Sequence, residues 1–253
     1  MPFPLLQKTK IFSGNALKII AAAAMLIDHI GFLFFPFSHA WMRCVGRLAF
    51  PLFAFFIAEG CRYTKNRARY FCLLAGLAIA CQAVVQIAVP ETDMMSILMT
   101  FSFSVLLIYA LQYAKDRFAK KAPALLCAGA SFVFIGGVVG VYFLMEYSVF
   151  DYGFWGCMTP VFASLLDVKR NPAPAFLQKI DLPILRALCM LPPLLFLTFE
   201  GGMPASWQAH ALLSLGLLCF YNGKRGKWNM KYFFYIFYPA HLVILYGILY
   251  FFF

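Results

Sequence analysis

The sequence has 253 residues, of which 63% are hydrophobic and only 12% are charged, and this is too apolar for a soluble domain with a wetted surface. The formal net charge of +11 does not indicate a nucleic-acid-binding protein, because the basic residues are spread over several short links without a basic helix or patch. Composition therefore predicts an integral membrane protein that contacts the lipid bilayer and no nucleic acid.

Apolar runs of about 17 to 22 residues recur along the chain and are separated by short polar links. Their length favours α-helices over the alternating segments of a β-barrel. We therefore predict an all-α, polytopic membrane helix bundle that forms a single domain over residues 1–253. The nine predicted transmembrane helices cover residues 17–37, 45–62, 70–90, 94–113, 123–145, 149–167, 184–200, 205–221 and 231–252.

Charged residues in the links indicate how these helices are oriented. Lysine and arginine gather before the first predicted helix and after the second, fourth, sixth and eighth, whereas acidic residues dominate the other links. By the positive-inside rule, the N-terminus is cytoplasmic and Phe253 lies outside. Arg43 and Arg47 break the rule on the outer side, where either a local partner holds them or they extend to lipid headgroups.

Titratable residues inside the predicted helices are candidates for function, because a charge at the centre of a bilayer costs about 3 kcal/mol or more. They are Asp28, His29, Arg47, Glu59, His210 and His241, with Lys18 and Arg43 at the margins. Asp28 and His29 are helix neighbours and so point about 100° apart, toward different partners. Lys18 and His29 share one helix face and lie roughly 17 Å apart by helical rise.

Each of these candidates has a structural alternative. His29 is either the general base that removes a proton from a nucleophile or a neutral histidine hydrogen-bonded between helices. Asp28 either forms a salt bridge with Arg47 or takes part directly in the chemistry. His241 follows Pro239, which is expected to kink its helix, and it either lines a cavity or bridges two helices.

The remaining polar groups have simpler interpretations. Glu59 is expected to pair with Arg62 or Lys18, and His210 is expected at the membrane interface. The eight cysteines occur singly, without the paired spacing or nearby histidines of a metal site. No metal is predicted.

Four segments carry a family resemblance: "LKIIAAAAMLIDHIG", "GRLAFPLFAFFIAEGCRYTKNRARY", "DYGFWG" and "NGKRGKWNMKYFFYIFYPAHLVILY". They closely resemble the TraX family, whose named member acetylates the N-terminus of F-type conjugative pilin. This family is similar to the wider transmembrane acyltransferase superfamily, in which a basic residue precedes a catalytic histidine of the first helix by eleven positions. Lys18 and His29 fit that spacing, with lysine in place of arginine.

The resemblance implies an acetyl-CoA-dependent acyltransferase, either an N- or an O-acetyltransferase, in the bacterial inner (cytoplasmic) membrane. The pantetheine arm of acetyl-CoA, the acyl donor, extends about 15–20 Å, close to the expected distance from Lys18 to His29. His29 is the implied catalytic base. We expect Arg47 to stabilise the oxyanion or hold the acceptor, and Asp28 to position that arginine or the imidazole of a neighbouring histidine. The residues implied in binding the donor are Lys18, Arg62, Lys224, Arg225 and Lys227.

The acceptor is expected to enter from the outer side. The residues implied in binding it are Arg43, Asp151, Tyr152 and His241, although capping of a helix is the simpler interpretation of Asp151. The expected acceptor is an amine at a peptide or pilin N-terminus, and a hydroxyl of a cell-surface glycan suits the same geometry. Direct transfer and an acetylated His29 both remain open. A carrier or flippase is the alternative from another class.

Overall fold

The computed structural model describes residues 10–36, 38–169, 174–200, 205–228 and 230–252. Within these ranges the regular structure is helical, and the β-type pairing consists of two isolated bridges, Phe12 with Tyr221 and Met95 with Phe150. The all-α prediction is confirmed for this part of the chain.

Seven helices in the described ranges are long and apolar enough to cross a membrane. They are α2 (Gly14–Phe34), α3 with α4 (Ala40–Gly46, Ala49–Tyr63), α5 (Arg67–Ala88), α6 (Ile97–Ala119), α7 (Ala124–Tyr147), α10 with α11 (Pro183–Leu188, Leu191–Glu200) and α14 (Lys231–Phe252). They correspond to the first five, the seventh and the ninth of the predicted helices. This pattern is that of a multi-pass membrane protein.

The predicted helix over 149–167 is much shorter in the structure, where α8 covers Gly153–Ala163. Phe150 is held in the bridge to Met95, and Tyr152 has a positive φ of 59°. Gly153, the first residue of α8, also has a positive φ of 49°, and two successive residues in the left-handed region do not continue a right-handed helix, so α8 begins only here.

The predicted helix over 205–221 also differs. It is divided into α12 (Ala205–Ala209), the 3-10 helix η1 (His210–Leu212) and α13 (Leu213–Cys219). Apolar composition shows that a segment avoids water, but it does not fix the length of the helix that the segment forms. The structure therefore departs from the nine-helix prediction at these two places.

The chain folds into two compact units. The first comprises Met1–Phe56 and Leu194–Phe253, and the second comprises Ile57–Pro193. The boundaries fall inside α4 and α11, so each of these two helices contributes residues to both units. A single functional domain over residues 1–253 remains a prediction.

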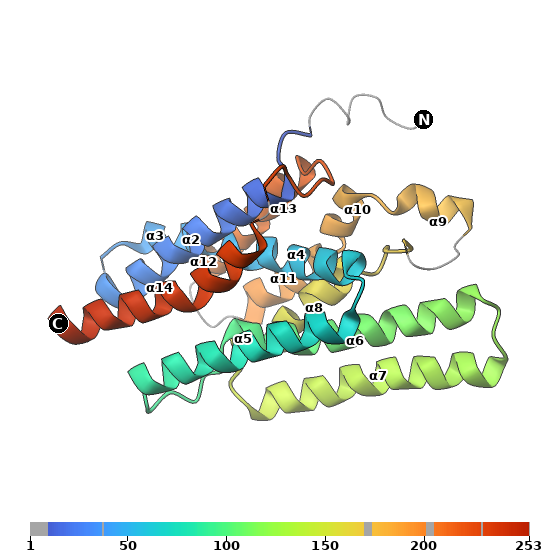
Figure 1. Ribbon diagram of the computed structural model, residues 1–253, viewed down its shortest axis with the longest axis horizontal. Coiled ribbons are helices and arrows are strands. Elements are labelled where there is room, and N and C mark those ends of the chain that lie inside the picture. The colour runs from blue at the N-terminus through green and yellow to red at the C-terminus, as the bar shows by residue number, and fades with distance from the viewer. Residues whose placement is uncertain (1–9, 37, 170–173, 201–204, 229, 253) are drawn as a thin grey trace. The chain divides into compact units, whose positions relative to one another are not determined.

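In the first unit, α3 and α14 pack against α2 (Figure 1). Glycine lies at two points of the contact between α2 and α3, where a small residue lets two helices approach closely. A Cβ atom at Gly31 would lie 2.8 Å from Cβ of Met42, and one at Gly46 would collide with the carboxylate of Asp28. These two glycines bring α3 alongside the turn of α2 that carries Asp28.

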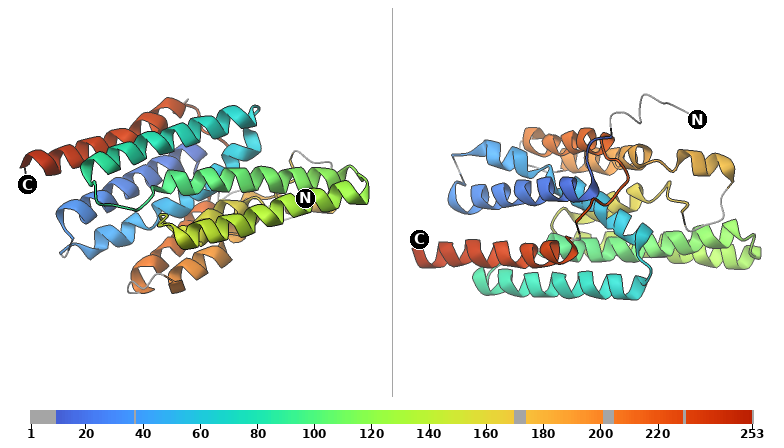
Figure 2. Two further views of the ribbon diagram at one scale, coloured as in Figure 1. Left: turned by 90° about the horizontal axis from the view of Figure 1, so that it is seen from below. Right: turned by 45° about the horizontal axis from the view of Figure 1, so that its top comes forward.

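In the second unit, α5, α7 and α8 pack against α6, and α6 and α7 form an antiparallel hairpin (Figures 1 and 2). Two hydroxyl groups of α6 are fully buried and donate hydrogen bonds, one to α8 and the other to the segment just before α8. Ser104 Oγ donates to the carbonyl oxygen of Cys157 at 2.8 Å, and Thr100 Oγ1 donates to that of Asp151 at 2.9 Å. These bonds satisfy polar groups that water does not reach.

Charged side chains of the second unit form a buried group that we call the ion cluster. Its members are Glu59, Arg62, Lys115, Asp167, Asp181 and Arg186. Arg186, which is 2% exposed, pairs with Glu59, which is 6% exposed. Arg62 pairs with Asp167 and, at 2.7 Å, with Asp181. Each buried charge thus faces an opposite charge, which offsets the cost of removing it from water.

Lys115 joins the ion cluster from α6. Its Nζ donates to the carbonyl oxygens of Ser164 at 2.9 Å, Leu165 at 2.7 Å and Asp167 at 3.1 Å. A cation at these carbonyls compensates the negative end of α8 and holds the following segment on α6.

Glu59→Leu is expected to destabilise the second unit by about 3–5 kcal/mol, because Arg186 is then buried without this carboxylate. The double variant Glu59→Leu/Arg186→Leu is expected to recover much of the loss, since it removes both charges. Thermal and denaturant unfolding of the purified protein in detergent measure the effect. Lys120→Ala, which breaks the exposed Asp116–Lys120 pair, is the control and should cost about 1 kcal/mol or less. Equal stability of the single and double variants would contradict the expectation.

Gly46→Ala is expected to destabilise the first unit by about 1–3 kcal/mol, because the added methyl group overlaps the carboxylate of Asp28. Thermal unfolding of the purified protein measures the loss. Gly247→Ala on α14 is the matched control, since a Cβ there meets nothing within 4 Å, and it should be neutral or slightly stabilising. Equal unfolding temperatures of the two variants would contradict the expected overlap.

Candidate functional site

The turn of α2 that carries Asp28 and His29 directs the two side chains to different helices, as expected for helix neighbours. Asp28 faces α3: its Oδ2 lies 2.9 Å from Nη1 of Arg43, and its Oδ1 lies 3.7 Å from Nη2 of Arg47. Nη1 of Arg43 also donates to the carbonyl oxygen of Asp28 at 3.3 Å. The ion pair expected between Asp28 and Arg47 is present, and Arg43 is the nearer partner.

This group of three charges is largely withdrawn from solvent. The side chains of Arg47, Asp28 and Arg43 are 16%, 19% and 20% exposed. The guanidinium of Arg43 also lies 5.1 Å from the ring centre of Phe32. The carboxylate holds the guanidinium N–H groups in place. Because the surroundings have a low dielectric constant, these groups interact strongly with any negative charge that develops beside them.

Gln208 of α12 extends this group and is not among the candidates predicted from the sequence. Arg47 Nη1 lies 3.4 Å from Oε1 of Gln208, which accepts the hydrogen bond. Nε2 of Gln208 is buried and has no hydrogen-bond partner in the structure. The available signal was a polar amide within the apolar segment 205–221. Gln208 therefore places a further N–H donor near the two arginines.

His29 has one ring nitrogen committed to its own helix. Its Nδ1 lies 2.8 Å from the carbonyl oxygen of Met25, one turn earlier. A carbonyl oxygen only accepts hydrogen bonds, so Nδ1 carries the proton and donates it. The lone pair of the neutral ring is therefore on Nε2, which is the atom able to act as a base.

His241 of α14 meets His29. The two ring centres are 5.0 Å apart, and the ring planes are inclined by 77°. His241 is 4% exposed, with Phe237 stacked on its ring at 5.2 Å and Tyr238 edge-on at 5.4 Å. Its Nδ1 donates to the carbonyl oxygen of Phe237 at 3.0 Å, whereas its Nε2 is buried and has no hydrogen-bond partner among the residues that the structure describes. Both imidazoles thus have the same tautomer, with the lone pair on Nε2.

Lys18 lies near the other end of α2, between two aromatic rings. Its Nζ is 5.0 Å from the ring centre of Phe56 and 5.7 Å from that of Phe234. Rings contributed by α4 and α14 attract an ammonium group through their electron-rich faces. The lysine is thereby fixed at this end of the first unit.

The basic loop, residues 222–228, is tied to the start of α2. The amide N–H of Gly14 donates to the carbonyl oxygen of Lys224 at 2.8 Å, and that of Asn15 donates to the carbonyl oxygen of Arg225 at 2.9 Å. The first amides of a helix have no partner within the helix, so these carbonyls satisfy them. The loop is therefore positioned by main-chain hydrogen bonds.

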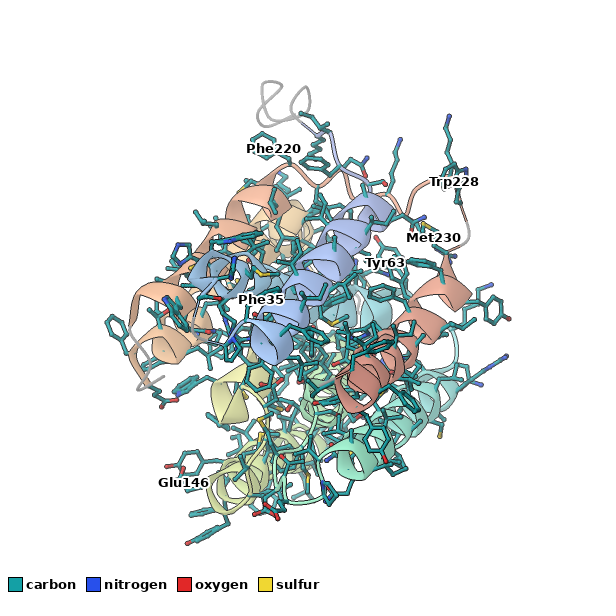
Figure 3. All side chains as sticks on the ribbon, turned by 90° about the vertical axis from the view of Figure 1, so that its left-hand side faces the viewer. Phe35, Tyr63, Glu146, Phe220, Trp228 and Met230 are labelled. Carbon is teal, nitrogen blue, oxygen red and sulfur yellow. The ribbon has the colours of Figure 1, made fainter. Side chains whose placement is uncertain are left out.

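Gly226 and Trp228 shape the basic loop. Gly226 has a φ of 104°, and a Cβ there would lie 3.0 Å from Oγ of Ser13, so glycine is required. Trp228 is 75% exposed and projects from the loop (Figure 3), while its carbonyl oxygen accepts from Nδ2 of Asn15 at 2.7 Å. The structure thus brings Lys224, Arg225 and Lys227, all exposed, to the end of α2 near Lys18.

Three residues implied in binding the donor or the acceptor, Arg62, Asp151 and Tyr152, belong to the second unit. Arg62 is held by two carboxylates of the ion cluster, which gives it a structural role. The amide of Asp151 donates to the carbonyl oxygen of Met95 at 2.9 Å. The N-cap position of α8 is occupied by Tyr152, so Asp151 lies one residue too early to be the expected cap. Binding of donor or acceptor by these residues remains a prediction.

The site residues of the first unit combine a possible base with a group of N–H donors. Nε2 of His29 is able to accept a proton, and a second imidazole lies beside it. Arg43, Arg47 and Gln208 gather N–H donors on the neighbouring elements. The base faces α14 and the donors lie on the α3 side of the same turn of α2; a base and N–H donors are the two kinds of group that general-base catalysis with oxyanion stabilisation requires.

Comparison with known proteins agrees with this description. The chain is 27% identical over 252 residues to the probable fimbrial assembly protein FimC, serogroup H1, of Dichelobacter nodosus, and the alignment covers 92% of this chain and 94% of that protein. No solved structure matches. The model of the TraX protein family matches residues 13–249. The chain therefore belongs to the TraX family.

Proposed function

We propose that this chain is a membrane-embedded acetyltransferase, which moves an acetyl group from cytoplasmic acetyl-CoA to an amine acceptor at the outer side of the membrane. The proposal is carried by one observation: Nδ1 of His29 is committed to Met25, so its Nε2 is left as a base within a turn that also faces Arg43 and Arg47. The positive-inside orientation places the basic loop on the cytoplasmic side.

Family membership supports the choice of reaction and acceptor. The named member of the TraX family acetylates the N-terminus of a pilin, and the Dichelobacter nodosus relative is named as a fimbrial assembly protein. We infer that the acceptor is the N-terminal amine of a pilin or fimbrial subunit. The bacterial inner membrane is the compartment that offers both acetyl-CoA and such a subunit.

The chemistry follows from the placement of the side chains. The amine nitrogen attacks the thioester carbonyl carbon as its proton moves to Nε2 of His29. The oxyanion is stabilised by Arg47, which Asp28 holds in position, and by the nearby N–H donors. The C–S bond then breaks, and the proton passes from His29 to the thiolate of CoA. Attack by Nε2 itself, to give an acetylated histidine, is the other possible route.

The donor side is assigned to the basic end of the first unit. Lys18, Lys224, Arg225 and Lys227 would pair with the phosphates of CoA. Lys18 and His29 are three helical turns apart on α2, roughly 17 Å by helical rise, and an extended pantetheine arm covers about the same distance. The acetyl group would then reach His29 while the nucleotide stays at the basic loop.

His29→Ala is expected to lower acetyl transfer by roughly 100- to 10,000-fold, the usual contribution of a general base. Transfer is measured with the purified protein, acetyl-CoA and a peptide that carries a pilin N-terminus, by mass spectrometry of the peptide and by release of CoA thiol. Binding of CoA should stay within about threefold, since His29 lies far from the phosphates. His39→Ala, at an exposed histidine of the same unit, is the control.

Full activity of His29→Ala would remove His29 from the mechanism. If the unmodified chain moves a solute saturably and transfers no acetyl group, the carrier is the correct class. Transfer to a glycan hydroxyl and not to the peptide would select the O-acetyltransferase.

Replacing Lys224, Arg225 and Lys227 together by glutamine is expected to raise the KM for acetyl-CoA about tenfold with little change in kcat, because exposed charge contacts contribute roughly 0.2–1 kcal/mol each. The salt dependence of KM should weaken as well. Initial rates at low and high ionic strength measure both effects. Lys120→Gln/Lys121→Gln, which removes two exposed lysines of the second unit, is the matched control. An unchanged KM would refute this assignment.

A further inference from the structure

The proposed reaction releases two protons from the acceptor, and His29 alone can take up only one of them. An α-amine is mostly protonated at neutral pH, because its pKa is about 8. An ammonium loses two protons when it becomes an amide: one before nitrogen can attack, and one afterwards. The second proton leaves on the thiol of CoA. The first needs another acceptor, and a hydroxyl nucleophile would not require one.

A second base lies directly beside His29. His241 presents a buried Nε2 that has no hydrogen-bond partner in the structure, on a ring that is 4% exposed. A buried ring nitrogen that carries a lone pair and has no hydrogen-bond partner among the described residues is able to take up a proton. Both histidines commit Nδ1 to a carbonyl oxygen one turn back, so Nε2 is the only basic atom on each ring.

The surroundings of the pair leave few other destinations for a proton. Tyr238 contacts His241 edge-on, and Phe237 covers one face of its ring. Phe237 and Tyr238 themselves pack on the apolar core of α2 and α4, around Ala24, Met25 and Ala49. The charged groups on the α2–α3 side are Asp28, Arg43 and Arg47, which are already paired with one another.

We propose that His241 acts through His29 as a proton-relay residue, an inference that rests on the proposed function. The ammonium of the acceptor gives its first proton to Nε2 of His29. His29 passes this proton to Nε2 of His241, either through a direct N–H···N hydrogen bond or through one water. His29 is then neutral again, takes the second proton as nitrogen attacks, and delivers it to the CoA thiolate as the C–S bond breaks. The products are the amide, CoA thiol and one proton on His241, which passes back to His29 and from there to solvent once the products have left.

The test uses the purified full-length chain, acetyl-CoA and two matched probes. One probe is a peptide with a pilin N-terminus, and the other is the same peptide with a hydroxyl in place of its N-terminal amine. His241→Asn keeps a donor for the carbonyl oxygen of Phe237 but removes Nε2. His241→Phe keeps the ring packing and serves if the asparagine variant does not fold. His39→Asn is the control histidine.

The relay predicts a pH-dependent loss. At pH 6.5 about 3% of an amine with a pKa near 8 is neutral, so transfer to the amine should fall roughly 30-fold in His241→Asn or His241→Phe. At pH 9 the loss should shrink to within about threefold, because the amine arrives already neutral. Transfer to the hydroxyl probe should stay within about threefold at both values.

Two results would overturn the relay. An equal loss at both pH values and with both probes would show that His241 has only a packing role. Unchanged transfer to the amine at pH 6.5 would show that it has no role in the reaction. Failure of the proposed function is distinct, since the unmodified chain would then transfer acetyl to neither probe at any pH.

Discussion

Charged side chains that leave water for an apolar helix bundle require compensating charges or dipoles, and both units are arranged around this requirement. In the second unit, Arg186 and Glu59 are almost completely buried and pair with each other. Arg62 lies between two further carboxylates, and Lys115 is surrounded by carbonyl oxygens. Such pairing fixes the helix ends and gives this cluster a structural role.

The first unit meets the same requirement beside the proposed site. Asp28 is held between two arginines, so its charge is compensated. Nε2 of Gln208 and Nε2 of His241 are among the buried side-chain atoms, found in both units, that have no hydrogen-bond partner within the described residues. Buried polar atoms are costly unless something else contacts them during the working cycle. A donor and a base left open beside paired charges are therefore consistent with a reaction site.

Preorganisation of the two imidazoles comes from the main chain. Each histidine donates Nδ1–H to a carbonyl oxygen one turn earlier in its own helix, which fixes both the tautomer and the ring position. The contact between α2 and α14 then sets the rings 5.0 Å apart. Glycine on α3 lets the arginines approach from the other side of the same turn. The site thus depends on helix packing more than on any loop.

The sequence by itself determined the helical class, seven of the apolar helices, the separate directions of Asp28 and His29, and the family, because helix period, apolar length and motif spacing are local properties. Tertiary structure alone decided that Arg186 is the partner of Glu59, that Gln208 joins Arg47, and that the rings of His29 and His241 meet. It also shortened the predicted helix over 149–167, through the positive φ of Tyr152 and the bridge at Phe150. Such contacts join residues that are tens to hundreds of positions apart, and which helices pack together depends on the shape of the whole interface and not on the composition of any one segment.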